Sequence, residues 1–507
     1  MTQISSLDRF IQYVWRFCLI SAPITSLSLF SKGGEIRPVS TLVASLILPV
    51  VVYAHLRSKS IDRPTLTVMG LFFWLTGIGL LMLLLSPPDC VTGKPQPWML
   101  YLKGALSLTS GLAVYLLGRL SLRNKEDVIT SAQWLAAGAL LTSLFAFVQV
   151  VSQQDAFHSV RPAIAAFSAL FSHAYLDSNA PHMGRGHGFA YEPSYLASLL
   201  IVLVIPIGCA LIKLWGGKHA RIGVLMVSVG TLGLLSSGSR IGIAFGTLQI
   251  SILLLLLLSF GNWRGLLLAS SGITLAVICF FSATTVNRYV AIPAYALTPQ
   301  SHIAEGHVAE GHVAEGHVAE GHVAEGHVAE GHVAEGHVAE GHIAEGESTK
   351  ASYDATQGSP WVSPPNVVLV TNTAPRFAAA LASLGVWAEH PLLGAGLGLA
   401  PLHMIARFPS WAENWQEIID GVDNKSPVLI NSMSMIFRLL AEGGLIAFFI
   451  WGLVIFFHLP SPSIQTGAPI ILLSLIGVFA DALLIASFSM PYFWILLCFL
   501  KAMRNAP

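Results

Sequence analysis

Two ionisable residues stand at the entrance to an apolar run in the segment Gly184 to Leu199, GRGHGFAYEPSYLASL. Arg185 and Glu192 fall where a polar loop becomes a membrane-length stretch, a depth at which a charge is costly unless it is paired, solvated or used. Pro193 favours the first turn of a helix, so Glu192 is predicted at the N-cap. There the carboxylate could take part in chemistry, or it could only offset the helix dipole. Tyr195 can share its helical face.

Arginines provide the complementary charge. The turn SSGSRIG at 236–242 is so short that the two spans it joins must be antiparallel neighbours, with Arg240 near their outer tip. An arginine there could snorkel at the interface, or it could bind an anion together with helix N-terminal amides. Arginine dominates the predicted outer face, as expected for bidentate contacts to phosphate or carboxylate. An outward acid and several arginines on a membrane protein suggest a membrane-held diphosphate as the ligand.

The composition predicts the elements that must hold these residues. Hydrophobic residues make up 54% of the 507 positions and charged residues 11%, and the mean hydropathy is +0.67, which indicates an all-α polytopic membrane protein. A spanning helix needs about 20 apolar residues. Twelve stretches qualify or nearly qualify, at 15–30, 36–56, 66–85, 98–118, 128–150, 190–214, 220–237, 240–258, 264–282, 430–457, 468–486 and 488–503.

Lysine and arginine concentrate in alternate connections between these stretches, as they do on the cytoplasmic side of membrane proteins. Both termini are therefore predicted in the cytoplasm. Residues 1–282 would form spans one to nine with an outer loop at 151–190. Residues 283–429 would form a large extracytoplasmic loop, and residues 430–507 would form spans ten to twelve.

The large loop contains a repeat, in which H-[I/V]-A-E-G occurs nine times over residues 302–346. A period of five matches neither the strand period of about 2 nor the helical period of about 3.6, so a flexible, disordered insert is predicted. Metal capture is the alternative, since histidine and glutamate ligate zinc or copper, but the repeat implies no fixed geometry. The insert holds nine glutamates and no lysine or arginine, so the other residues carry 27 basic and 18 acidic side chains, a net charge of +9.

Four segments carry a family resemblance. GFAYEPSYLA, SSGSRIG, HPLLGAGLG and FRLLAEGGLIAFFIWG, in this order, resemble the bacterial O-antigen polymerase and O-antigen ligase superfamily, and the resemblance covers most of the chain. It implies a GT-C-like membrane fold and transfer of oligosaccharide from a polyprenyl diphosphate carrier, outside the cytoplasmic membrane. The acceptor would be a growing glycan in a polymerase, or a lipid core in a ligase.

Individual residues carry over from this resemblance. Arg240 resembles the family's arginine after the seventh span, and Arg376, upstream of HPLLG, resembles its loop arginine. Ligases of the superfamily usually show a His-Asn pair before the tenth span, whereas Asn431 has no adjacent histidine here. The EPS sequence at Glu192 is associated with polymerases, so both points favour a polymerase. His187, Tyr195, Arg288 and His390 are secondary candidates, although a histidine is more often a surface or packing residue.

The chemistry is consistent with these residues. A glycoside hydrolase needs two carboxylates because its leaving group must be protonated, but a diphosphate leaves without that help. Glu192 would act as the base or position the acceptor, while Arg185, Arg240 and Arg376 would bind the diphosphate. Direct displacement would invert the anomeric carbon, and no cofactor and no metal are expected.

The expected partners and location follow from the same resemblance. They are a polyprenyl-diphosphate-linked oligosaccharide, membrane lipid, a chain-length regulator and a flippase, with no nucleic acid. The protein is expected to be multi-pass in the bacterial cytoplasmic (inner) membrane, with its active site facing the periplasm or exterior.

A polytopic transporter is the rival from another class. The predicted spans are nearly free of acids and bases, with Asp481 and Arg438 as the main exceptions, and no inverted halves are evident. A reaction at the outer surface explains that distribution better than a path through the midplane. A His-rich metal-binding protein is a third possibility, which depends on the repeat alone.

Overall fold

The computed structural model divides the chain into two compact units, Met1–Arg288 with Pro375–Pro507, and Tyr289–Ala374. Each unit is described by itself. The residues that the structure describes are 6–27, 37–58, 62–88, 94–153, 159–172, 185–214, 217–259, 261–283, 317–319, 322–324, 327–328, 374–415, 418–419, 422–423, 429–459 and 468–505.

The first unit is helical, and eight of its described helices are long and apolar enough to cross a membrane. The protein is therefore an α-helical polytopic membrane protein. Seven are single helices: α4 (Arg63–Leu85), α5 (Pro97–Ser121), α6 (Lys125–Val151), α10 (Gly217–Ser237), α11 (Arg240–Ser259), α12 (Trp263–Ala283) and α19 (Met435–His458). The eighth joins three pieces, α8 (Pro193–Leu199), η3 (Leu200–Val204) and α9 (Ile205–Leu214).

Four of the predicted spans are shorter or broken. The stretch predicted at 36–56 is divided into α2 (Val39–Leu46) and α3 (Leu48–Ser58), which are bent by 59° and would together count as a ninth span. Pro49 lacks the N–H that would continue the first helix, which explains the break. The other three are α1 (Ser6–Ser21), α20 (Ala468–Leu484) and α21 (Pro491–Asn505), with 16, 17 and 15 residues. By length, the described helices do not reach the predicted twelve.

The three-piece helix lies at the centre of the bundle, with 94% of its apolar window buried. Its middle piece, η3, is a π-helix, and Pro206, two residues after its end, cannot donate to the preceding turn. Gln249 of α11 donates from Nε2 to the carbonyls of Ile201 and Leu473, both at 2.8 Å. This side chain therefore connects the π-helix to α20.

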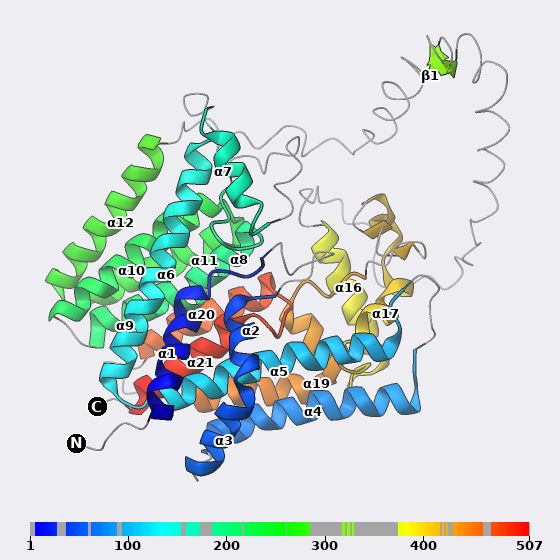
Figure 1. The fold of residues 1–507 in the computed structure, drawn as a ribbon, viewed down its shortest axis with the longest axis horizontal. Helices are drawn as coiled ribbons and strands as arrows, with labels where there is room; N and C mark the ends of the chain where they lie inside the picture. The colour runs from blue at the N-terminus through cyan, green and yellow to red at the C-terminus, as the bar shows by residue number, and fades with distance from the viewer. Residues whose placement is uncertain are drawn as a thin grey trace. The chain divides into compact units, whose positions relative to one another are not determined.

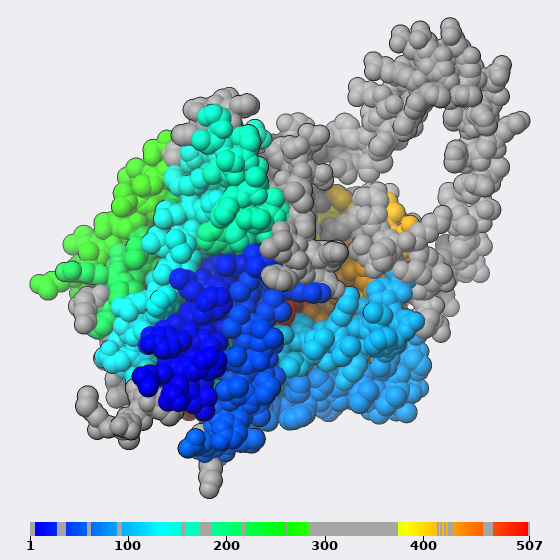
Figure 2. Space-filling view, viewed as in Figure 1, coloured from blue at the N-terminus to red at the C-terminus, as the bar shows by residue number. Residues whose placement is uncertain are grey.

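The other helices pack around this centre (Figure 1). α10 contacts α6, α9 and α12, while α4 runs along α19, and α5 contacts both α4 and α21. Figure 2 shows the face formed by the N-terminal helices in blue and by α6 and later helices in cyan to green. One large apolar core extends through these elements and includes the fully buried Trp15, Tyr115 and Phe499.

The second unit contains the repeat, of which the structure describes three short strands. They are β1 (His317–Ala319), β2 (His322–Ala324) and β3 (His327–Val328), in a parallel sheet of order β1-β2-β3. The register pairs His317 with His322 and His322 with His327, so each strand is displaced by one repeat. Each repeat thus forms one short strand that pairs with the equivalent residues of the next repeat, five positions later. The periodicity within a single strand does not predict such pairing between repeats. The rest of the predicted disordered insert, and Arg288, lie outside the described residues.

Candidate functional site

Two of the four family-like segments meet at one end of the bundle. The amide of Gly186 donates to the carbonyl of Ser236 at 2.8 Å, and Arg185 Nε donates to the carbonyl of Ser237 at 3.1 Å. A Cβ placed on Gly242 would lie within 2.5 Å of the Ala197 side chain, so the first turn of α11 packs directly on α8. Arg240, the first residue of α11, therefore starts its helix beside the helix that follows Glu192.

The loop before Glu192 is held by side chains from other elements. Its backbone amides donate to three buried polar side chains. The amides of His187 and Gly188 both donate to Gln149 Oε1 at 2.9 Å. The amide of Phe189 donates to Thr142 Oγ1 at 3.0 Å, and the amide of Tyr191 donates to Thr25 Oγ1 at 2.7 Å. Such bonds satisfy backbone groups that have no partner in a helix or sheet. The polypeptide is therefore fixed where it enters α8.

Glu192 lies at the N-cap of α8, as the sequence predicts, with extended φ and ψ. Its carboxylate makes no capping hydrogen bond to the helix, and it accepts instead from Ser194 Oγ at 3.0 Å. An N-cap side chain normally accepts from the amides of the first turn. Capping alone therefore does not explain this acid, whose side chain is half-buried.

Arg376, which is distant in sequence, lies near Tyr195 in the first turn of α8. It lies in the first turn of α16 (Ala374–Glu389), and its Nη1 donates to the carbonyl of Leu484 at 3.3 Å. Tyr195 lies close enough to both Glu192 and Arg376 to be affected by their charges. Tyr195 therefore lies between Glu192 at the start of α8 and Arg376 of α16, and Arg376 is held by the last carbonyl of α20.

Two of the three predicted arginines make hydrogen bonds that stabilise the fold, and the third does not. Arg185 and Arg376 each bind the last carbonyl of a helix, Ser237 of α10 and Leu484 of α20. Such carbonyls lack helical partners and favour a nearby cation. Arg240 is exposed, begins a helix where a cation is unfavourable, and makes no hydrogen bond or ion pair with another described residue. Packing and capping do not explain Arg240.

A buried ion pair lies beside this end and was missed by the sequence analysis. Arg438 Nε donates to Glu442 Oε1 at 3.0 Å, and the side chains are 10% and 1% exposed. Arg438 also donates to the carbonyl of Ala486 and stacks over the ring of Phe488 at 4.7 Å. The i, i+4 spacing in FRLLAEGG could have indicated the pair, because such residues share a helix face.

The other two family-like segments also meet each other. HPLLGAGLG packs against the interruption of α19 at Gly444, whose φ of 67° and ψ of −168° are not helical. Backbone bonds join Ala395 to Ala441 at 2.7 Å and Gly396 to Glu442 at 3.0 Å. A Cβ on Gly394 or Gly444 would collide with the facing backbone. These glycines permit close backbone contact.

The remaining candidates lie elsewhere or have structural partners. His390 makes an edge-to-face contact with His403, with ring centroids 5.8 Å apart. It lies at the opposite end of α16 from Arg376, about 21 Å along the helix axis. His187 is buried and bonded at both ring nitrogens. Asp481 of α20 is buried and accepts from Ser198 Oγ, which joins α20 to α8. Among the described residues, no group of three or more potential ligands could hold a metal ion.

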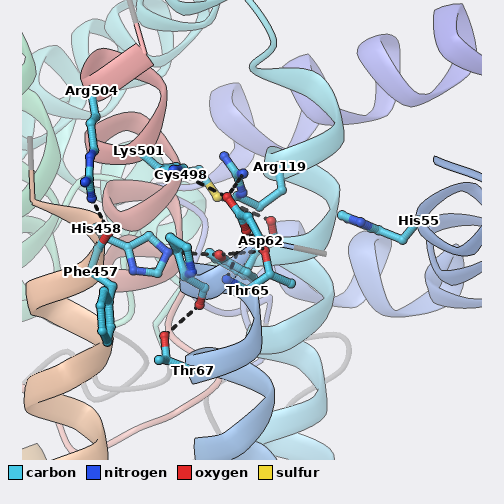
Figure 3. A network of polar contacts seen from close by, with 12 residues as sticks. His55, Asp62, Thr65, Thr67, Arg119, Phe457, His458, Cys498, Lys501 and Arg504 are labelled. Atoms are coloured by element: carbon cyan, nitrogen blue, oxygen red, sulfur yellow. Dashed lines mark hydrogen bonds and ion pairs between the residues drawn. The ribbon is translucent and has the colours of Figure 1, made fainter. Parts of the chain in front are cut away.

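The opposite end of the bundle holds a separate polar network (Figure 3). Asp62 accepts from Arg119 at 2.8 Å and from Thr65 at 2.7 Å, and lies 3.4 Å from Lys501. Burial acts to raise the pKa of Asp62, but the bonds from Thr65 and the charges of Arg119 and Lys501 outweigh it and lower that pKa. Nearby, Tyr115 bonds to His458 Nε2 at 2.9 Å. These residues include cations that the sequence analysis assigned to the cytoplasmic side, and no predicted site residue lies among them.

Comparisons with protein-family models, with curated proteins and with solved structures found no match to this chain. Functional inference therefore depends on the geometry of the site and on the four segments, which the structure joins in two pairs.

Proposed function

We propose that this protein is a membrane glycosyltransferase that polymerises oligosaccharide repeat units from a polyprenyl diphosphate carrier. The observation that carries the proposal is the placement of Glu192, whose carboxylate makes no capping hydrogen bond, and of the exposed Arg240 at the starts of two packed helices. Arg376 adds a second cation from α16. A carboxylate beside cations is the minimum set for displacing a diphosphate from a sugar.

The proposed step forms a bond between the acceptor hydroxyl oxygen and the anomeric carbon of the donor. The bond from that carbon to the carrier phosphate breaks, and its electron pair leaves with the diphosphate. Glu192 takes the hydroxyl proton. Arg240 neutralises the developing charge, and the guanidinium groups of Arg185 and Arg376 bind the diphosphate. The attack inverts the anomeric carbon and uses no metal or cofactor.

The paired state of the buried charges supports an enzyme over a transporter. In the described helices, Arg438 forms an ion pair with Glu442, and Asp481 accepts a hydrogen bond from Ser198. A transporter would need such groups to bind a substrate or ion near the midplane. The EPS sequence and the lack of a histidine beside Asn431 favour a polymerase over an O-antigen ligase.

The proposal includes a location. The basic network around Asp62 would face the cytoplasm, and Glu192 and Arg240 would face the periplasm or exterior of the bacterial inner membrane. α1, α20 and α21 would complete a GT-C-like bundle of twelve spans as short, tilted or partly buried crossings.

Deletion of the gene in its host tests the function. Loss of long surface glycan chains with single capped units retained, seen by gel, indicates a polymerase. Loss of all capping indicates a ligase instead. An unchanged glycan profile contradicts both enzymes.

A further inference from the structure

Gln149 is one of three buried side chains that hold the loop between Arg185 and Glu192, and it makes more of these contacts than Thr142 or Thr25. Gln149 lies near the end of α6 and is 1% exposed. Its Oε1 accepts from the amides of His187 and Gly188, both at 2.9 Å. Its Nε2 lies 2.8 Å from Ser168 Oγ and 3.1 Å from His187 Nε2. Nε2 also lies 3.5 Å from the carbonyl of Gly188, so this side chain makes five contacts with the loop and with α7 (Arg161–Ser168).

These contacts determine the orientation of the Gln149 amide. The two backbone N–H groups can only donate, so the atom that faces them must be the amide oxygen. Exchange of the oxygen and nitrogen would place two donors against an amide NH₂ group. The NH₂ group of Gln149 therefore faces Ser168 and His187.

The amide in turn determines the protonation state of His187. Because Gln149 Nε2 donates, His187 Nε2 must accept and carries no proton. His187 Nδ1 lies 2.5 Å from the carbonyl of Ala190 and must donate to it. Only the neutral imidazole with its proton on Nδ1 satisfies both contacts. A second proton would place two donors against each other in a site that is 0% exposed.

We propose that Gln149 and His187 are positioning residues, which together fix the loop from Arg185 to Tyr191 and so place Arg185 and Glu192 for reaction. The inference depends on the proposed glycosyl transfer for its effect on activity, but not for its effect on the loop. Among the residues that the structure describes, the charged side chains on the elements around this anchor are Arg185 and Glu192 on the loop and Arg161 at the start of α7, since α6 and α10 carry their other charges at their far ends.

Gln149→Glu is the sharpest test because it keeps the shape and the acceptor for His187 and Gly188. A carboxylate oxygen would then face the unprotonated Nε2 of His187, and the two acceptors would repel. A proton shared between the two groups would restore the contact at low pH. We expect hydrogen exchange of residues 185–191 to be about tenfold faster than in the wild type at pH 8 and to return to the wild-type protection at pH 5.5.

Gln149→Leu is the matched control, since it has similar size and binds no proton, so its loop should stay unprotected at both pH values. Full-length protein purified in detergent serves for exchange. Activity is measured in membrane vesicles supplied with the host's polyprenyl-diphosphate-linked repeat unit. There kcat/KM of Gln149→Glu should fall at pH 8 and recover toward the wild-type value at pH 5.5. If Gln149→Glu shows wild-type loop protection at both pH values, the anchor is overturned. Recovery of loop protection in Gln149→Leu at pH 5.5 would overturn it as well.

His187→Gln separates positioning from proton transfer, and it is a milder change should Gln149→Glu fail to fold. Its amide oxygen can replace Nε2 as the acceptor, but it cannot shuttle a proton. We expect it to retain the loop protection and most of the polymerising activity. Protected but inactive His187→Gln protein would show that His187 acts chemically and would overturn the positioning role. If wild-type vesicles do not polymerise while the exchange results hold, the proposed function fails and the anchor stands.

Discussion

At the scale of single residues, two of the three arginines of the candidate site have a structural role and the third has none. Arg185 and Arg376 bind helix-terminal carbonyls, so their replacement would disturb the fold as well as a ligand. Arg240 is exposed and begins a helix, where the dipole disfavours a cation. A residue that the fold does not need is the cleanest probe of function.

Arg240→Ala should therefore abolish chain growth without loss of protein. Removal of one charge-stabilising donor costs roughly 10²- to 10³-fold in rate in related chemistry. The measurement is glycan length by gel in a complemented deletion strain, with abundance by immunoblot. Arg264→Ala is the matched control, because Arg264 is also an exposed arginine at a helix start. Normal chain length in Arg240→Ala would remove this residue from the mechanism.

Glu192→Gln should lower the rate about 10²- to 10⁴-fold, since the amide keeps the size of the side chain but cannot take a proton. Stability should change little because the carboxylate makes no capping bond. Initial rates in vesicles and thermal unfolding in detergent would be compared with those of Glu126→Gln, which changes an exposed acid in the first turn of α6. Wild-type rates in Glu192→Gln would exclude it as the base.

At the scale of elements, the interruption of α19 explains two glycine-rich segments at once. Gly444→Ala should destabilise the protein by more than about 2 kcal/mol, because alanine disfavours a φ of 67° and its Cβ would collide with the carbonyl of Leu392. Gly452→Ala, in the same helix with no atom within 4 Å of the added Cβ, should shift stability by less than about 1 kcal/mol. The thermal midpoint in detergent measures both. Equal midpoints would contradict a requirement for glycine at 444.

The His390 and His403 pair beside α17 (Ala400–Met404) predicts a dependence on pH. Burial, followed by the charges of Arg407 and His390, lowers the pKa of His403 below 6.5, although Glu389 acts to raise it. The folded protein thus resists protonation of His403, so its contribution to stability falls as the pH drops below about 6.5. His403→Gln should lose less of its thermal midpoint than the wild type between pH 7 and 5. Parallel curves would show that His403 does not contribute.

Local features of these elements were predictable, but most contacts between them were not. Glu192 at an N-cap and the tight turn before Arg240 follow from the positions of proline and glycine and from the apolar runs beside them. The break at Pro49 and the π-helix before Pro206 were missed because hydropathy does not detect them. The pairing of HPLLGAGLG with α19 joins backbone groups across about 50 residues, and one sequence contains no direct signal for such contacts.

At the scale of the whole molecule, charge separates the two ends of the first unit. Asp62, Arg119 and Lys501 link α4, α5 and α21 at one end, and Glu192, Arg240 and Arg376 lie at the other. Lysine and arginine concentrate on the cytoplasmic side of membrane proteins. The contacts of Asp62 with Arg119 and Lys501 therefore support an orientation with this end of the bundle toward the cytoplasm. The proposed reaction therefore belongs to the end with fewer lysines.

Deletion of residues 302–346 should leave chain growth and abundance intact. The repeat lies wholly within the second unit, so its removal breaks no described hydrogen bond or ion pair of the first unit. The deletion also removes nine glutamates, which raises the net charge from 0 to +9 and would strengthen any attraction to anionic lipid. Glycan length, abundance and zinc titration of the full and shortened chains would be measured together. If the shortened chain no longer binds zinc but still supports chain growth, zinc binding is incidental to the function. If chain growth is lost at normal abundance, the repeat takes part in the function, which would contradict a site confined to the helical unit.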